Sequence, residues 1–243
     1  MYNILLIGKE LPDSSSFCES LRNNENKIFC SASSETDAVN FQTENISFSN
    51  WNYSSAVSAH SFLIKAETNL EKISHVIFYY DSAYFSTKFK LDRNDEISMS
   101  LDQLINSYIY STSELLKRID QKKEPITVSF ILKTYPSKYE ISTSGNKYAN
   151  VIPASTIVNI GEASFEHLAQ NFATNVSNRE YLTVFLVKNT FNNELYKNDK
   201  QLSTWLLESF KILSQTKHHQ TLKQATTWNK VGSKISTGFS LFK

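Results

Sequence analysis

The pattern of hydrophobic and polar positions is clearest between Gly161 and Thr190. An apolar stripe at helical spacing is formed by Phe165, Leu168, Ala169, Phe172, Ala173 and Val176. Residues 181–187 then form a nearly continuous apolar and β-branched run, which is typical of a strand covered on both faces. A helix followed closely by a buried strand is half of a βαβ unit.

The rest of the chain repeats this alternation of buried strands and amphipathic helices. Strands are predicted at 2–7, 27–32, 46–48, 75–80, 126–132 and 181–187. Helices are predicted after Asp13 or Ser14 and at 35–40, 55–70, 101–119, 161–176 and 202–213. Loops are expected at 82–98 and 134–153, and the weak alternation of 231–242 predicts an edge strand. With no internal repeat or linker, the order predicts one Rossmann-like three-layer α/β domain over residues 1–243, built on a doubly wound parallel sheet.

Charge and apolar content exclude several classes of protein. The chain has 25 basic and 24 acidic residues and no basic block, which gives no electrostatic reason to expect nucleic acid or an anionic membrane as partner. No apolar run reaches the ~20 residues that span a bilayer, and the chain starts directly in a strand without a signal-peptide pattern. We therefore expect a cytoplasmic protein. Cys18 and Cys30 are interpreted as small buried hydrophobes rather than a disulfide framework.

Glycine is scarce, with five residues in 243, whereas proteins average about 7%. Backbone cradles for phosphate need clustered glycines, because only glycine lets the backbone approach the ligand closely. The chain has no such cluster, which argues against a phosphate-wrapping loop.

The order and spacing of elements over residues 2–190, the long helix near 101–119 and the run Ala163–Ala173 resemble the short-chain dehydrogenase/reductase family. That resemblance implies a Rossmann fold, NAD(P) as cofactor, and self-association through two long helices. The family's phosphate turn, T-G-x-x-x-G-x-G, is matched only in part. Gly8 aligns with its first glycine and is the candidate cofactor-binding residue, or else a plain turn glycine. Pro12 and Ser14 replace the second and third glycines.

The family's N-N-A-G segment, a wall of small residues beside the cofactor, aligns with Phe78-Tyr79-Tyr80-Asp81. The two tyrosines would fill the space, or else form an aromatic platform for another ligand. Asp81 follows the carboxyl end of a predicted strand, where α/β proteins bind ligands, and is therefore a candidate binding residue.

The catalytic motifs of the family are largely absent. Asn106 aligns with an asparagine that organises a proton-relay water in the family, or else is structural. In the family's Tyr-x-x-x-Lys pair the tyrosine acts as acid and base and the lysine lowers its pKa. Val158 stands at the tyrosine position and Glu162 at the lysine position, and neither can perform these roles. Tyr148 lies ten residues before Val158, and a catalytic serine is represented only by uninformative candidates, Ser142 and Ser144.

No metal site is expected. His218 and His219 are adjacent in a polar stretch with no carboxylate or cysteine beside them, which favours a solvated surface.

Three hypotheses follow. The first is a non-catalytic relative that binds a small ligand or a protein partner and needs no cofactor. The second is an atypical NAD(P)-dependent oxidoreductase with replacement groups, whose Asn106 and Tyr148 would face an open pocket. The third is a scaffold subunit that pairs with an active homologue. The resemblance also implies a homodimer or homotetramer through helices 99–120 and 161–176, with Tyr108, Tyr110 and Phe165 as contact residues.

Overall fold

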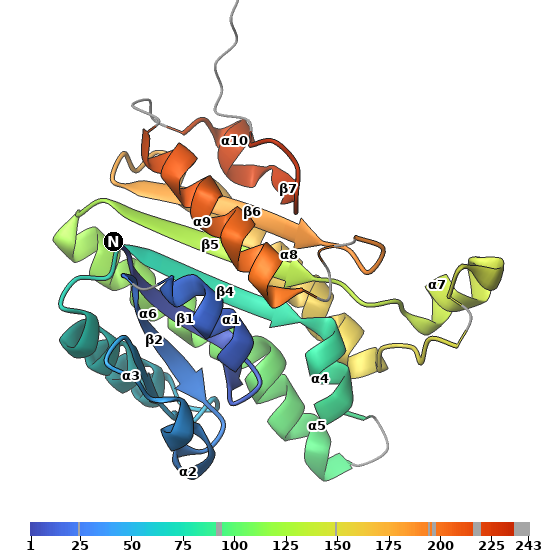
Figure 1. The fold of residues 1–243 in the computed structure, drawn as a ribbon. Helices are drawn as coiled ribbons and strands as arrows, with labels where there is room; N and C mark the ends of the chain where they lie inside the picture. The colour runs from blue at the N-terminus through green and yellow to red at the C-terminus, as the bar shows by residue number, and fades with distance from the viewer. Residues whose placement is uncertain are drawn as a thin grey trace, which may run out of the picture.

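The computed structural model describes residues 1–23, 25–90, 94–148, 150–193, 195, 198–215 and 220–235. In this part of the chain one seven-stranded sheet has the order β3-β2-β1-β4-β5-β6-β7, and all neighbouring strands pair in parallel (Figure 1). The strands are β1 (Asn3–Leu11), β2 (Lys27–Ala32), β3 (Ile46–Ser49), β4 (His75–Asp81), β5 (Ile126–Lys133), β6 (Leu182–Asn189) and β7 (Trp228–Lys230).

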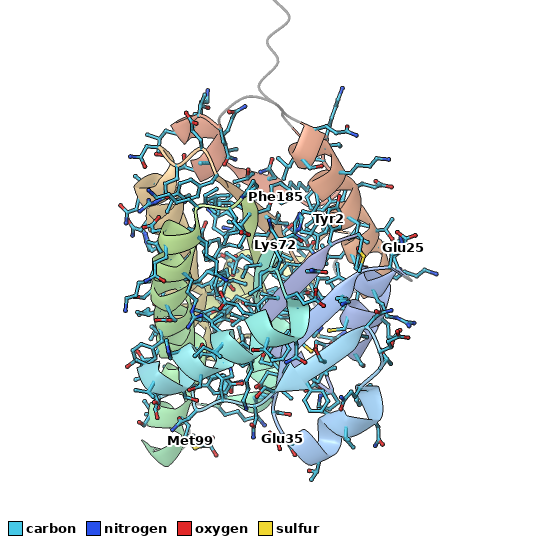
Figure 2. All side chains as sticks on the ribbon, turned by 90° about the vertical axis from the view of Figure 1, so that its left-hand side faces the viewer. Tyr2, Glu25, Glu35, Lys72, Met99 and Phe185 are labelled. Atoms are coloured by element: carbon cyan, nitrogen blue, oxygen red, sulfur yellow. The ribbon has the colours of Figure 1, made fainter. Side chains whose placement is uncertain are left out.

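Helices cover both faces of the sheet, as the edge-on view shows (Figure 2). The described helices are α1 (Ser15–Arg22), α2 (Glu35–Ala38), η1 (Val39–Phe41), α3 (Ala56–Leu70), α4 (Ser82–Lys88), α5 (Asn94–Leu101), η2 (Asp102–Asn106), α6 (Ser107–Lys122), α7 (Lys138–Thr143), η3 (Gly145–Tyr148), α8 (Thr156–Val176), α9 (Asp199–Gln215) and α10 (Leu222–Thr226). Helices α1 and α9 pack on one face, and α3, α6 and α8 pack on the other. The predicted three-layer, doubly wound parallel sheet is confirmed.

The core divides into two layers because alternate strand residues point to opposite faces. On the α1/α9 face, Phe185 of β6 packs near Trp205 of α9, with ring centroids 5.8 Å apart. On the α6/α8 face, aromatic rings dominate, and Phe165 of α8 lies 4.9 Å from Tyr108 and 5.4 Å from Tyr80. These rings are fully buried and pack behind the carboxyl ends of β4 and β5.

Two predicted loops contain helices. The prediction of an irregular segment at 82–98 was wrong, because Asp81 caps α4 by accepting a hydrogen bond from the backbone N–H of Tyr84, and Tyr84 and Phe85 are buried. In the segment 134–153, Ser137 and Glu140 form a capping box that starts α7. Figure 1 shows α7 extending away from the body of the molecule.

The carboxyl-terminal edge strand also differs from its prediction. The strand that pairs with β6 is β7, a few residues earlier than the predicted 231–242 segment, and residues 236–242 of that prediction lie outside the described residues. Among the described helices, none is long and apolar enough to cross a membrane.

Candidate functional site

The carboxyl ends of β1, β4, β5 and β6 form the edge where the candidate residues gather (Figure 1). The strand order reverses between β1 and β4, because β2 follows β1 on one side and β4 lies on the other. In doubly wound sheets, ligands bind outside the carboxyl ends of the strands at this reversal.

Gly8 does not begin an open turn. The strand β1 continues through Leu11, so the predicted turn directly after Gly8 was wrong. Gly8 has a φ of +116°, and a Cβ atom there would collide with the backbone carbonyl oxygen of Tyr79 and the hydroxyl of Tyr108. That hydroxyl donates a hydrogen bond to the same carbonyl, at 2.9 Å. The structure therefore explains Gly8 by close packing of β1 against β4 and α6.

The replacements for the other two glycines lie just before α1. Pro12 is half-buried, and Ser14 is fully buried with its backbone N–H donating to the carbonyl of Glu10, at 2.8 Å. Pro12 has no N–H to offer a ligand, and the N–H of Ser14 already has a protein acceptor.

Buried charged side chains lie at the carboxyl ends of β1, β4 and β5 on the α1/α9 flank. The Lys9 Nζ atom lies 3.4 Å from Asp81 Oδ2 and 3.4 Å from Asp199 Oδ2, and Lys133 Nζ lies 3.3 Å from the same Asp81 oxygen. The side chains of Lys9, Asp81 and Lys133 are no more than 10% exposed. Burial lowers the pKa of Lys9, but the Asp81 and Asp199 carboxylates outweigh this effect and raise it overall. We call Lys9, Asp81, Lys133 and Asp199 the charged cluster.

Asn189 extends the charged cluster along the sheet edge. Asp81, Lys133 and Asn189 are direct register partners on β4, β5 and β6. Asn189 is fully buried, and its side-chain nitrogen and oxygen have no hydrogen-bond partner in the part of the chain that the structure describes. A buried amide without partners is rare in proteins and marks this position as one that a polar molecule would stabilise.

On the opposite flank, tyrosines fill the space beside α8. Tyr80 is fully buried, and its hydroxyl donates to the Val158 carbonyl at 2.8 Å. A Cβ atom at Gly161 would collide with this hydroxyl and would lie 2.9 Å from the Cβ of Leu104. Burial and the nearby Glu162 raise the pKa of Tyr80 well above its ordinary value. The ring of Tyr80 thus lies beside the buried Val158, the residue that the sequence alignment places at the position of the family's catalytic tyrosine.

Glu162 interacts with protein groups on this flank. Its carboxylate accepts a hydrogen bond from the hydroxyl of Ser82, the first residue of α4, at 2.5 Å. Burial raises the pKa of Glu162, while the Ser82 hydrogen bond and the charge of Lys188 oppose this increase. A carboxylate here would raise rather than lower the pKa of a neighbouring phenol.

Asn106 ends a π-helical turn, η2, between α5 and α6. Its side-chain amide donates to Asp102 Oδ1 at 2.8 Å, and the residue is half-buried. π-helical turns often occur at functional sites, and nothing in the sequence pattern indicated this one.

Tyr148 and the two candidate serines belong to the extension around α7. The Tyr148 hydroxyl accepts a hydrogen bond from Asn192 at 3.2 Å, and its ring lies 5.7 Å from Phe191. Ser142 and Ser144 donate to carbonyl groups of α7 itself. These three residues therefore contact the extension and the segment after β6. Their hydrogen bonds and ring contacts named here involve neither Asn106 nor Val158.

Sequence reasoning missed Lys9, Glu10, Lys133 and Asp199. The sequence did contain a signal for Lys9, Glu10 and Lys133, because a charged residue directly after an apolar run lies at the ligand-binding edge of the sheet. Lys9 and Glu10 come directly after the run YNILLIG, and Lys133 comes directly after ITVSFIL. Asp199 gave no such signal, because it begins a helix distant in sequence.

The first turn does not fit a dinucleotide in the manner of the resembling family. Lys9 and Glu10 are 8% and 2% exposed, so other protein atoms already cover them. The glycine-lined approach for a pyrophosphate is closed by Tyr79 and Tyr108 at Gly8, and the nearest buried carboxylate, Glu10, would repel phosphate. No group of three or more metal-ligating side chains occurs among the described residues, and His218 and His219 lie outside them.

Comparison with known proteins gives the fold but no close relative. No protein-family model matches the sequence, and no curated protein does. The structure is similar to that of a short-chain dehydrogenase from Rhodopseudomonas palustris, with a TM-score of 0.62 and 8% identity over 96% of this chain and 99% of the other. It is similar to serine dehydrogenase from Escherichia coli, with a TM-score of 0.61 and 9% identity over 94% and 95% of the two chains.

A third similar structure is an alcohol dehydrogenase from the archaeon Thermococcus sibiricus in complex with 5-hydroxy-NADP. Its TM-score is 0.55, with 11% identity over 87% of this chain and 91% of the other. Identities this low show shared architecture rather than shared chemistry. The chain has the fold of the short-chain dehydrogenases/reductases.

Proposed function

We propose that this protein is a non-catalytic homologue of the short-chain dehydrogenases/reductases, which acts by binding a ligand or a protein partner and uses no nicotinamide cofactor. The observation that carries the proposal is the filling of the sheet edge by the chain's own side chains. Tyr80 lies against Val158 and Gly161, and Lys9 and Glu10 are buried at the carboxyl end of β1. The replacement of the catalytic pair by Val158 and Glu162 points in the same direction.

Calorimetric titration with NAD(H) and NADP(H) tests this proposal. We expect no heat of binding at millimolar cofactor. A dissociation constant near micromolar, equivalent to about 8 kcal/mol, would overturn the proposal. Serine dehydrogenase from Escherichia coli, which has the same fold, serves as the comparison protein in the same assay.

An atypical NAD(P)-dependent oxidoreductase is the second candidate. The bound 5-hydroxy-NADP in the Thermococcus sibiricus structure and the placement of Asn106 in a π-helical turn favour it. This candidate requires the edge to open, since Tyr80 is fully buried. Cofactor binding that is lost in Asn106→Ala would place the cofactor beside η2, whereas binding that is unchanged in this variant would place it elsewhere.

We further propose that two copies of the chain associate through α5, η2, α6 and α8. An apolar groove of about 190 Å³ lies between η2, α6 and α8, lined by Leu104, Ile105, Tyr108, Ile109, Ser164, Phe165 and Leu168. Ile109 is 44% exposed beside it and Ile160, one turn before Ser164, is 49% exposed, which is the kind of exposed apolar surface that subunits bury.

Light scattering tests the association. The wild-type chain should elute at a multiple of its 27.8 kDa mass, and Ile109→Glu should shift it to the monomer by placing a charge in the interface. Val57→Glu on α3, which is 75% exposed and outside the groove, is the matched control and should leave the mass unchanged. A concentration-independent monomer for the wild type would rule out this association.

A further inference from the structure

The Glu10 carboxyl group lies buried at the end of β1, with only 2% of the residue exposed. Its Oε2 atom accepts from Gln103 Nε2 at 2.7 Å and from the Tyr84 hydroxyl at 3.5 Å. Its Oε1 atom is buried and has no hydrogen-bond partner among the described residues. Buried carboxylate oxygens are normally satisfied by donors, so this carboxylate retains an unused acceptor.

Lys88 supplies a cation beside this carboxylate. Its Nζ atom lies 3.4 Å from Glu10 Oε2 and 4.4 Å from the centre of the Tyr84 ring. An ammonium over an aromatic face and next to a carboxylate is the standard arrangement by which proteins recognise amines. The 3.4 Å separation is longer than the 2.7–2.9 Å of a strong charge-assisted hydrogen bond, and the Lys88 side chain is 28% exposed. The ion pair is therefore long, and the side chain that supplies the ammonium is partly exposed.

The position of these groups in the fold favours a ligand. Glu10 lies at the carboxyl end of β1, whereas Tyr84 and Lys88 lie on α4, which follows β4, so they flank the point where the strand order reverses. We propose that Glu10, Tyr84 and Gln103 form a binding site for the ammonium group of a small primary amine, and that Lys88 fills this site when no amine is bound. The inference deepens the proposed ligand-binding role and assigns the site a chemistry opposite to that of a phosphate.

The charge state of Glu10 is consistent with this assignment. Burial raises the pKa of Glu10, and the charge of Lys88 and the hydrogen bonds from Lys88, Gln103 and Tyr84 oppose that increase. The ammonium of a bound amine, in the place of Lys88, would stabilise the ionised carboxylate in the same way, which provides a driving force for binding.

Replacement of the lysine by an external amine tests the proposal. Lys88→Met keeps an apolar stem but removes the ammonium. We expect n-propylammonium chloride to raise the melting temperature of Lys88→Met at millimolar concentration, with an apparent affinity at least tenfold higher than for the wild type. Lys90→Met, which removes an exposed lysine two residues away, should respond like the wild type. Sodium chloride at equal ionic strength and 1-propanol control for salt and for the propyl group.

A second measurement locates the bound amine. In Lys88→Met, the side-chain amide signals of Gln103 should shift in nitrogen-edited NMR spectra as n-propylammonium is added, and the shift should disappear in Glu10→Gln/Lys88→Met. Unchanged Gln103 signals in a folded Lys88→Met variant, or an equal thermal response in the double variant, would overturn the proposal. Titration of NAD(H) into the same samples reports separately on the proposed function.

Discussion

The two flanks of the sheet's carboxyl edge are closed in different ways. On the α1/α9 flank, the charged cluster of Lys9, Asp81, Lys133 and Asp199 fills the edge, with ion pairs of 3.3–3.4 Å. On the α6/α8 flank, the buried rings of Tyr80, Tyr108 and Phe165 fill it. Burying aromatic rings is favourable in itself, whereas burying charges costs free energy that only good pairing offsets. The α6/α8 flank should therefore tolerate small changes, and the α1/α9 flank should depend on every charge.

Gly8 lies where the two flanks meet, and its substitution should have the largest effect. A Cβ atom in Gly8→Ala would collide with the backbone carbonyl of Tyr79 and the hydroxyl of Tyr108, and the φ of +116° disfavours any side chain. We expect a loss of about 4 kcal/mol in the free energy of unfolding, from strain and overpacking together. Urea unfolding of the wild type and Gly8→Ala measures this loss.

Gly145→Ala is the matched control for the backbone conformation. Gly145 also has a positive φ, +60°, but nothing lies within 4 Å of an added Cβ. Its substitution should cost only about 1 kcal/mol. Equal losses at the two glycines would mean that backbone strain, rather than the contact between flanks, determines the effect.

The next prediction compares one substitution on each flank. Asp81→Asn keeps the shape and the capping ability of the side chain but removes the carboxylate shared by Lys9 and Lys133. Breaking a buried ion pair from one side costs about 3–5 kcal/mol. Tyr80→Phe removes only the hydrogen bond to the Val158 carbonyl, worth about 1 kcal/mol.

Thermal and urea unfolding of the two variants give this comparison directly. A smaller loss for Asp81→Asn than for Tyr80→Phe would show that the charged cluster contributes little net stability. In that case the chain retains the cluster for a reason other than folding, and Asn189, with its buried and unpartnered amide, would be the first position to probe for a bound polar molecule.

The sequence predicted the layers of the fold better than the site. Apolar runs such as His75–Tyr80 specify buried strands locally, and β4 has nearly those bounds. Tyr79 and Tyr80 align with small residues of the family, which predicted that their rings fill the space beside the cofactor position. Both rings are fully buried, in agreement with that prediction. Lys9 and Asp199, by contrast, are 190 residues apart, and no local pattern indicates that they pair.

Local patterns also missed structure that depends on tertiary contacts. Residues 82–98 look polar, but α4 forms because Asp81 caps it and Phe85 packs into the core. Asn106 was identified by its position in a family motif, yet its π-helical turn and its bond to Asp102 have no signature in the sequence. Hydrophobic periodicity indicates which face of a helix or strand is buried. It does not indicate which element packs against that face, and only the structure shows this.

The smallest expected effect concerns Glu162, a half-buried acidic residue of α8 on the aromatic flank. Because the folded pKa of Glu162 is raised above its ordinary value of 4.5, the folded state holds more protons than the unfolded state between these two pKa values. Stability should therefore fall as pH rises through this window and level off above the folded pKa. In Glu162→Gln this decline should be absent, so the variant gains stability relative to the wild type as pH rises from about 4.5.

Ser82→Ala removes a hydrogen bond that lowers the pKa of Glu162, and should extend the decline in stability to higher pH. Urea unfolding at a series of pH values measures both variants, and parallel curves for wild type and Glu162→Gln would show that the pKa of Glu162 does not change on folding.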